Sequence, residues 1–290
     1  MRIHDKEIFA VAPVTCICRD LKSREYPIGN ATGFFYSYDG QIYFITNRHV
    51  VIDEEVGYYP ERLNLKLHKD RKDLTKNRPY KICLYDDDKN DEKKPLWLEH
   101  PQNRDRNIDL IDLVALPIEK NTIGEFYIEP FQNDKDLLPE TEDLILSGVH
   151  GKIEGYSIWV PLQVMGYPEG HYDRAHNLPI IRSATLASVI NVPFDRKPKC
   201  IIDAQLHKGT SGSPVIVRPG YYYDQHGYPH GNFPSGKDTN KYLLGVHSGE
   251  FDQQHPELGL HNVWFARLIR DIIKQNCKYF DSMKCKLEVD

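Results

Sequence analysis

Short segments rich in β-branched and aromatic residues recur along most of the chain, and they limit its possible folds more than any other feature. Gly, Pro, Asn and Asp separate these segments, a pattern typical of antiparallel sandwiches or barrels. In the clearest case, Asp39-Gly40 stands between two aromatic runs and suits a tight hairpin turn. Strands alternating with helical segments are absent from the pattern, which disfavours a doubly wound fold. The expected strands are 9–18, 31–38, 41–51, 62–68, 112–118, 143–149, 157–167, 179–190, 199–205, 213–217 and 241–248.

One helical pattern occurs near the end of the sequence, from Asn262 to Phe280. Its apolar residues recur at spacings of three and four, so they share one helix face, which we expect to pack against the body. These residues are Phe265, Leu268, Ile269, Ile272 and Ile273. Two other stretches are expected at the surface: 69–107, which is crowded with charge, and 218–240, whose Gly, Pro and Tyr content predicts a long loop.

The chain has 290 residues, enough for two domains, which we expect at 1–135 and 136–290. Its 37 Lys and Arg and 42 Asp and Glu give a net charge of −5, so no overall charge favours nucleic acid or an anionic membrane. No apolar run reaches the roughly 18 residues of a spanning helix, and the apolar segment Ile8–Cys18 follows HDKE rather than the positive residues of a secretion signal. The 6 cysteines lack C-x-x-C spacing. We therefore expect reduced thiols and a cytoplasmic protein.

Three segments carry the side chains of nucleophilic catalysis. His49 closes the apolar strand FITNRHVV, where a sheet would hold its ring and leave it reachable. Asp112 begins the apolar run DLVALPI, and Ser211 lies between glycines in GTSGSPV, where a tight turn exposes its hydroxyl and the neighbouring N–H groups. Taken singly, each has an ordinary structural explanation: a capped or half-buried histidine, a turn acid and a Gly/Ser turn.

Together the segments resemble the trypsin-like, chymotrypsin-fold serine peptidases, in particular the compact bacterial type with a TN-x-HVV block. The matching segments are TGFFY, FITNRHVV, DLVALPI, GTSGSPVIV and LLGVHSG, in the family's order of His, Asp and Ser, and they span roughly residues 8–270. The resemblance implies an all-β fold of two six-stranded antiparallel β-barrels with a C-terminal α-helix. The active site would lie in the cleft between the barrels, the first carrying His49 and Asp112 and the second Ser211.

The resemblance also implies a role for each residue. Ser211 would attack the scissile carbonyl to form an acyl-enzyme, His49 would take and return the proton, and Asp112 would orient the imidazole. The backbone N–H groups of Gly209 and Ser211 would form the oxyanion hole. Asp109 is the alternative acid, and Asp112 is preferred because DLVALPI matches the family's pattern of an acid followed by a strand.

Several positions bear on specificity. The Asp that trypsin-like digestive enzymes place before the nucleophile is Thr210 here, which removes one reason to expect activation by N-terminal cleavage. Gln205 stands where those enzymes place the acid that binds Lys or Arg, so cleavage after basic residues is not expected. By this resemblance, His247 occupies the position of a histidine that binds the Glu or Gln side chain of the substrate in glutamyl endopeptidases and in viral cysteine peptidases of this fold. We expect a preference for Glu or Gln, stronger for Glu if the ring is protonated, with Ser248 and Gly249 also in the substrate site. The alternative is that His247 is a structural strand histidine.

No cofactor is expected. His226 and His230 have H-x-x-x-H spacing, but they lie in a Gly and Pro loop rather than on a helix, so neither they nor His255 and His261 predict a metal site. The expected partners are a protein or peptide substrate and a regulatory protein, with no nucleic acid and no membrane. The alternative from another class is a catalytically silent or gated protease-fold binding module that holds a partner in the cleft or on the Tyr-rich loop.

Overall fold

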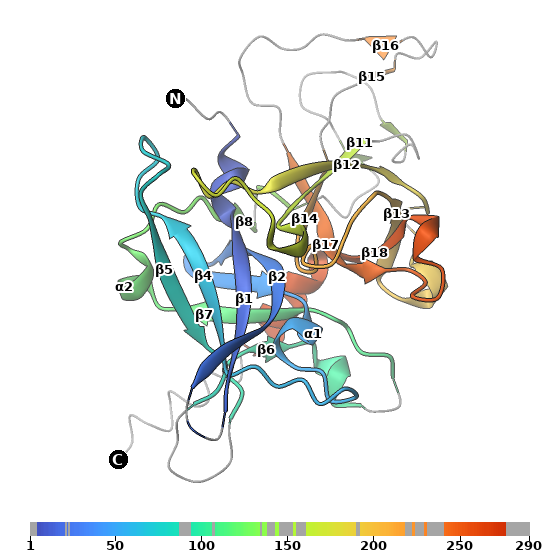
Figure 1. The fold of residues 1–290 in the computed structure, drawn as a ribbon. Helices are drawn as coiled ribbons and strands as arrows, with labels where there is room; N and C mark the ends of the chain where they lie inside the picture. The colour runs from blue at the N-terminus through green and yellow to red at the C-terminus, as the bar shows by residue number, and fades with distance from the viewer. Residues whose placement is uncertain are drawn as a thin grey trace, which may run out of the picture.

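The computed structural model consists of an N-terminal β-sheet followed by a C-terminal β-barrel (Figure 1). None of the helices within the described ranges has the length and apolar character needed to cross a membrane. The structure describes residues 5–20, 22, 24–86, 94–105, 108–133, 135–137, 143–144, 153–154, 161–189, 192–217, 222–223, 229–230 and 241–276.

The N-terminal sheet consists mostly of segments that the strand pattern predicts. Its strands are β1 (Val11–Arg19), β2 (Glu25–Tyr38), β3 (Gln41–Thr46), β4 (Arg62–His68), β5 (Asn77–Cys83), β6 (Leu98–Glu99), β7 (Val114–Ile118) and β8 (Phe131–Gln132). They run in the order β5-β4-β1-β2-β3-β7-β6, with β8 parallel to β2. β2 and β3 form the predicted hairpin, and Asp39 and Gly40 at its turn have φ values of 47° and 73°, which a type I′ turn requires.

The N-terminal sheet differs from the six-stranded barrel that the resemblance implies. It has eight strands, and among the residues described it does not close into a barrel. The segments beyond β5 and β6 meet in a single bridge between Tyr85 and Pro95, with one backbone hydrogen bond on each side. These two bonds run from the Asp86 N–H to Lys94 O and from the Leu96 N–H to Leu84 O, and no longer ladder joins the two edges among the residues described.

The C-terminal half confirms the prediction of a six-stranded antiparallel barrel. Its strands are β11 (Pro161–Gly166), β12 (Ile180–Leu186), β13 (Lys199–Asp203), β14 (Pro214–Val217), β17 (Tyr242–Glu250) and β18 (Leu260–Phe265). They close in the order β11-β12-β13-β18-β17-β14. Two further pairs are β9 (Asp143–Leu144) with β10 (Ile153–Glu154) and β15 (Tyr222–Tyr223) with β16 (Pro229–His230). Most of the predicted strand 143–149 and of the predicted loop 218–240 lies outside the described residues.

The C-terminal helix is present but begins later than predicted. Residues 267–276 are helical, whereas Asn262 and Phe265 belong to β18, which pairs with both β13 and β17 and thereby completes the barrel. The predicted helix began too early because Phe265 has the spacing of the helical apolar stripe, although as an aromatic residue it suits a strand equally well. The other predicted residues of the stripe are buried: Leu268, Ile269, Ile272 and Ile273. Residues 277–280 of the predicted helix lie outside the described residues.

One hydrophobic cluster joins the two halves of the molecule. Phe34 and Tyr36 of β2 belong to it, together with Met165 of β11 and Ile269 of the C-terminal helix. Two other clusters lie within the sheet and within the barrel. The short helices are η1 (Lys6–Ala10), α1 (Arg48–Val51), η2 (Pro101–Arg104), α2 (Lys120–Ile123), η3 (Pro168–Gly170), η4 (Phe194–Arg196) and η5 (Pro256–Leu258).

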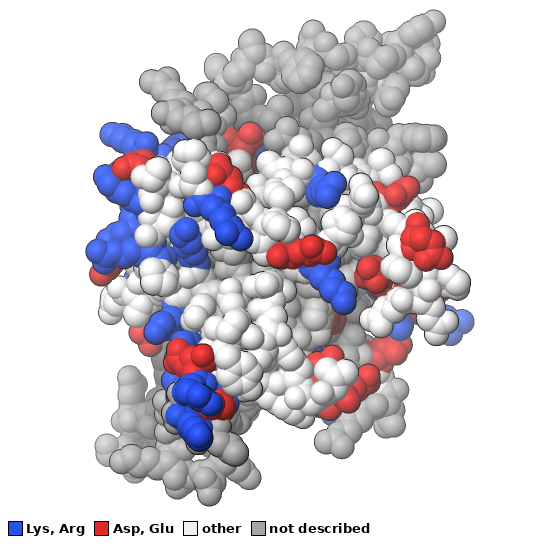
Figure 2. Space-filling model, in the orientation of Figure 1, with Lys and Arg blue, Asp and Glu red and all other residues white. Residues whose placement is uncertain are grey.

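The described part of the charged stretch 69–107 belongs to the N-terminal sheet and its surface. It forms the turn before β5, β5 itself, β6 and η2. Figure 2 shows Lys and Arg side chains gathered on the side of the molecule where β4 and β5 lie. Acidic residues are mixed with them: Lys76 lies 3.9 Å from Asp70 and 3.4 Å from Asp73. This surface therefore carries both signs of charge.

Candidate active site

The pairing of β3 with β7 brings His49 and Asp112 together. Thr46, the last residue of β3, pairs with Val114, the first residue of β7. Because the strands are antiparallel, the residues just beyond these ends lie side by side. His49 lies in α1, shortly after β3, and Asp112 lies just before β7.

Asp112 contacts His49 at two points. Its Oδ1 accepts a hydrogen bond from the His49 backbone N–H at 2.9 Å, and its Oδ2 lies 2.7 Å from the ring Nδ1. Since a carboxylate only accepts, Nδ1 carries the proton and Nε2 keeps its lone pair. Burial lowers the pKa of His49, but the charge of Asp112 and its hydrogen bond outweigh burial and hold that pKa above its ordinary value. The His49 side chain is 39% exposed, so it remains accessible to a reacting group.

Further hydrogen bonds fix the Asp112 carboxylate and its backbone. Ser248 Oγ of β17 donates to Asp112 Oδ2 at 2.6 Å, and Trp264 Nε1 of β18 donates to Ser248 Oγ at 3.1 Å. Asn47 Nδ2 donates to the Asp112 main-chain oxygen at 2.9 Å. The carboxylate is therefore held from the sheet by His49 and from the barrel by Ser248. Ser248 was predicted in the substrate site, and Trp264 was not predicted to take part.

The alternative acid, Asp109, lies in a different environment. Its carboxylate contacts Lys197 at 3.0 Å, and its side chain is 68% exposed. Of the two acids that the sequence left open, the structure places Asp112 beside His49.

Ser211 lies in a tight turn before β14. Gly209 and Gly212 on either side have φ values of 90° and 85°, in the left-handed region that favours glycine. A Cβ atom at Gly212 would lie 2.1 Å from the main-chain oxygen of Thr32, so this turn also needs glycine for space.

Thr32 of β2 holds this turn against the N-terminal sheet. Its N–H donates to Ser211 O at 2.9 Å, and its hydroxyl donates to Gly209 O at 2.8 Å. Thr46 Oγ1 of β3 donates in turn to Thr32 O at 2.8 Å. These bonds connect the turn that carries Ser211 to the strand that leads to His49. Thr32 was not predicted, although a hydroxyl residue inside the apolar run ATGFFY was a signal for it.

The turn that carries Ser211 leaves two backbone N–H groups free among the described residues. Those of Thr210, Gly212 and Ser213 each donate to a main-chain carbonyl. Those of Gly209 and Ser211 donate to no acceptor within the described part of the chain. Two free donors in one turn can stabilise negative charge on a carbonyl oxygen.

The Ser211 hydroxyl makes no hydrogen bond to His49 among the described residues. The turn and the histidine nevertheless lie in one region, because a Cβ at Gly212 would lie 2.5 Å from Thr46 Oγ1 at the end of β3. Contacts between a nucleophile and its base are often long until substrate binds.

His247 lies inside the C-terminal barrel and is only 1% exposed. Its Nδ1 lies 2.9 Å from Thr210 O, and its Nε2 lies 3.3 Å from His261 Nδ1. Burial lowers the pKa of His247 to about 3, so the ring is neutral in mildly acidic solution. A preference for Glu over Gln driven by its protonation is therefore not expected. Gln205 is exposed, and Gly249 has a φ of 91°.

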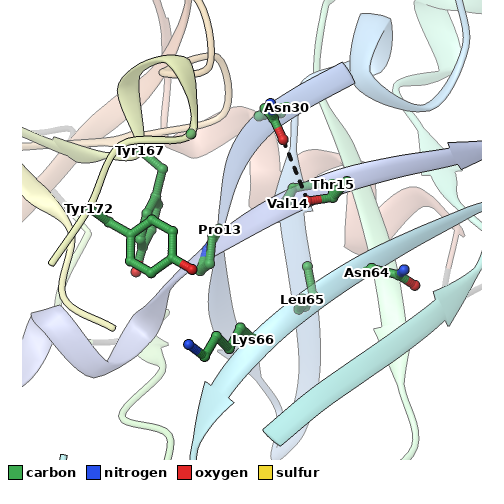
Figure 3. A pocket seen from close by; sticks show the side chains of 11 residues that line it. Pro13, Val14, Thr15, Asn30, Asn64, Leu65, Lys66, Tyr167 and Tyr172 are labelled. Carbon is green, nitrogen blue, oxygen red and sulfur yellow. Dashed lines mark hydrogen bonds between the residues drawn. The ribbon is translucent and has the colours of Figure 1, made fainter. Parts of the chain in front are cut away.

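A pocket with a volume of about 190 Å³ lies between the N-terminal sheet and the segment after β11 (Figure 3). Asn30 and Lys66 line it from the sheet, and Tyr167 and Tyr172 line the other side. The Lys66 ammonium lies 5.7 Å from the centre of the Tyr172 ring. A Cβ at Gly209 would lie 2.7 Å from the Tyr167 carbonyl oxygen, so the pocket adjoins the turn of Ser211.

Within the described ranges, no group of three or more His, Cys, Asp or Glu side chains is placed to hold a metal ion. His226 lies outside those ranges. No family model matches the sequence, and no curated protein matches it either. The site combines a base with a free lone pair, an acid that fixes its tautomer, a hydroxyl and two free N–H donors. These groups are the ones that acyl transfer needs.

Proposed function

We propose that this protein is a serine endopeptidase acting through Ser211, His49 and Asp112. The observation that carries the proposal is the two-point contact of Asp112 with His49, because it keeps Nδ1 protonated and leaves Nε2 able to accept a proton. The free N–H groups of Gly209 and Ser211 support it, since they lie beside the proposed nucleophile. In this proposal the fold is a variant of the trypsin-like peptidase fold, with domains at 1–135 and 136–290.

The proposed reaction has two steps. In the first, Ser211 Oγ attacks the scissile carbonyl carbon while His49 Nε2 takes the hydroxyl proton. The negative charge formed on the carbonyl oxygen is stabilised by the N–H groups of Gly209 and Ser211. His49 then gives the proton to the departing amine, and an acyl-enzyme forms. In the second step, water replaces the amine, and the same proton transfers release the acid and restore Ser211.

The preference for Glu or Gln belongs to the proposal as a separate expectation. Both ring nitrogens of His247 have partners inside the protein, and its proton lies on Nδ1, facing Thr210 O. Nε2 could donate to a substrate oxygen only if the proton moved to it and the 3.3 Å contact with His261 opened. The pocket lined by Asn30, Lys66 and Tyr172 offers further room beside the Ser211 turn for a substrate side chain. A profile of cleaved peptides from an unbiased library decides which residues are accepted.

The same library tests the proposed activity. Wild type should cleave peptides, and Ser211→Ala and His49→Ala should each lower the rate by about 10⁴-fold or more. Asp109→Asn is the matched control, because it removes an exposed carboxylate outside the site and should leave the rate unchanged. Equal cleavage by wild type and Ser211→Ala would mean that Ser211 is not the nucleophile.

A second candidate is a silent or gated binding module, and one observation favours it: Ser211 and His49 share no hydrogen bond. This candidate predicts no cleavage of any peptide and no reaction of Ser211 with a fluorophosphonate. It also predicts that a partner bound in the site is retained by Ser211→Ala. The first candidate is preferred because a binding module has no need for free N–H donors beside a fixed imidazole. The cytoplasmic location is proposed as well, consistent with the free thiols of Cys16, Cys18, Cys83 and Cys200.

A further inference from the structure

The peptide unit between Thr210 and Ser211 is held by its carbonyl end. Thr210 O accepts a hydrogen bond from the Ser213 N–H at 3.0 Å and lies 2.9 Å from His247 Nδ1. A peptide unit is planar and trans, so its C=O and N–H bonds point in opposite directions. Fixing the Thr210 carbonyl therefore fixes the direction of the Ser211 N–H, one of the two free donors.

The contact with Thr210 O also determines the tautomer of His247. A carbonyl oxygen only accepts, so His247 Nδ1 carries the proton, and Nε2, which faces His261, is unprotonated. The ring is buried and its pKa is about 3, so the neutral form persists at all pH values well above 3. The hydrogen bond from His247 Nδ1 to Thr210 O is therefore present whenever the barrel is folded.

We propose that His247 is a positioning residue for the proposed peptidase reaction: through the Thr210 carbonyl, its Nδ1–H aims the Ser211 N–H at the oxygen of the scissile bond. The inference rests on the proposed function and gives His247 a role other than reading the substrate side chain. A hydrogen bond to the carbonyl also polarises the peptide unit and makes its N–H a stronger donor.

The second free donor is held in a parallel way, which supports the inference. The Gly209 N–H belongs to the peptide unit whose carbonyl is Lys208 O, and this oxygen accepts a hydrogen bond from the Glu169 N–H at 2.5 Å. Both free donors are therefore fixed through the carbonyl at the opposite end of their own peptide unit. The Lys208 contact is made by backbone, whereas the Thr210 contact from His247 is made by a side chain that mutation can remove.

The test uses two variants of His247 in the full chain. His247→Leu removes the donor, and His247→Asn keeps an amide N–H close to the former position of Nδ1. His247→Leu should lower kcat by about 10- to 100-fold, less than the loss of a whole oxyanion donor, with KM changed by no more than about threefold. His247→Asn should recover most of this loss. The matched control is His68→Leu, because His68 is also buried and its Nε2 lies 2.7 Å from a carbonyl, that of His176, away from the site.

Two NMR measurements judge the inference without relying on hydrolysis. The ring ¹⁵N signals of His247 should show a protonated Nδ1 and an unprotonated Nε2, and the Ser211 amide ¹⁵N should shift in His247→Leu and return in His247→Asn. A protonated Nε2 with a bare Nδ1, or an unmoved Ser211 amide, would overturn the inference. So would a wild-type kcat in folded His247→Leu. Absence of both cleavage and fluorophosphonate labelling in wild type would instead overturn the proposed function, while the NMR signals still decide the role of His247.

Discussion

Replacing Asp112 by Asn tests the contact on which the proposed chemistry depends. At the Oδ1 position the carboxylate accepts only from the His49 backbone N–H, which cannot change its role. At the Oδ2 position it faces the His49 ring and the Ser248 hydroxyl, both of which can become acceptors. The Asn amide nitrogen should therefore take the Oδ2 position and force His49 into the tautomer with Nε2 protonated. That tautomer cannot accept a proton from Ser211.

The expected loss in kcat is on the order of 10⁴, or about 5.4 kcal/mol at 1.36 kcal/mol per tenfold. The free energy of unfolding should fall by about 1.5–3 kcal/mol, the range for a hydrogen bond to a charged group. Peptide cleavage gives the first quantity, urea denaturation the second, and ring ¹⁵N NMR the tautomer. An Asp112→Asn protein that keeps Nδ1 protonated, or that retains more than about a tenth of the wild-type kcat, would refute this reasoning.

Three further predictions concern protonation, packing and thiol reactivity. The pKa of His49 is raised in the folded protein, so protonated His49 stabilises the fold fully below its ordinary pKa of about 6.5, and this stabilisation is lost as pH rises through the folded-state pKa. Over the same pH range kcat/KM should rise, because the base becomes neutral. Denaturation profiles of wild type and His49→Ala check the first effect, and the pH–rate profile of wild type checks the second. Ser213 Oγ is buried without a hydrogen-bond partner among the described residues. Ser213→Ala should therefore raise the free energy of unfolding, measured by urea titration, by about 1 kcal/mol. A loss of stability would show that the hydroxyl makes a hydrogen bond. Burial raises the pKa of Cys16 to about 11 and of Cys200 to about 12, so in the folded protein the exposed Cys83 should react with a thiol reagent before either of them. Equal rates for these three thiols would contradict the burial.

Local sequence patterns predicted the strands well where turn chemistry and side-chain type agree. The hairpin at Asp39-Gly40 is an example, because its turn residues admit positive φ and both flanking runs are aromatic. The prediction was wrong where one segment fits two periods. Phe265 was assigned to a helix, but β18 needs it to close the barrel, and that requirement comes from β13 and β17 rather than from the segment itself.

Closure of the N-terminal sheet was not predictable from its segments. Whether the edges of a sheet join depends on how segments distant in the sequence meet, and here the described segments meet only in the bridge between Tyr85 and Pro95. The resemblance supplied the expectation of a six-stranded barrel, and the structure has an eight-stranded sheet instead.

The sequence pointed to the three side chains proposed to react but not to the residues that hold them. The motifs of His49, Asp112 and Ser211 are visible because each combines a reactive residue with a strand or turn signal. Thr32 and Trp264 act through contacts with residues distant in the sequence, and no local pattern marks such contacts. The environment of His247 was likewise hidden, since its burial and its bond to Thr210 arise only when the barrel forms.

The most direct test of the central claim is the site at which a fluorophosphonate reacts with the folded protein. Ser211 should be the labelled residue in a peptide map of wild type, because in the proposed mechanism His49 removes its proton and the N–H groups of Gly209 and Ser211 bind the phosphonyl oxygen. Labelling should disappear in Ser211→Ala and in urea-unfolded wild type, and it should slow by about 10³-fold or more in His49→Ala. An adduct on another residue, or equal labelling of folded and unfolded protein, would contradict the account.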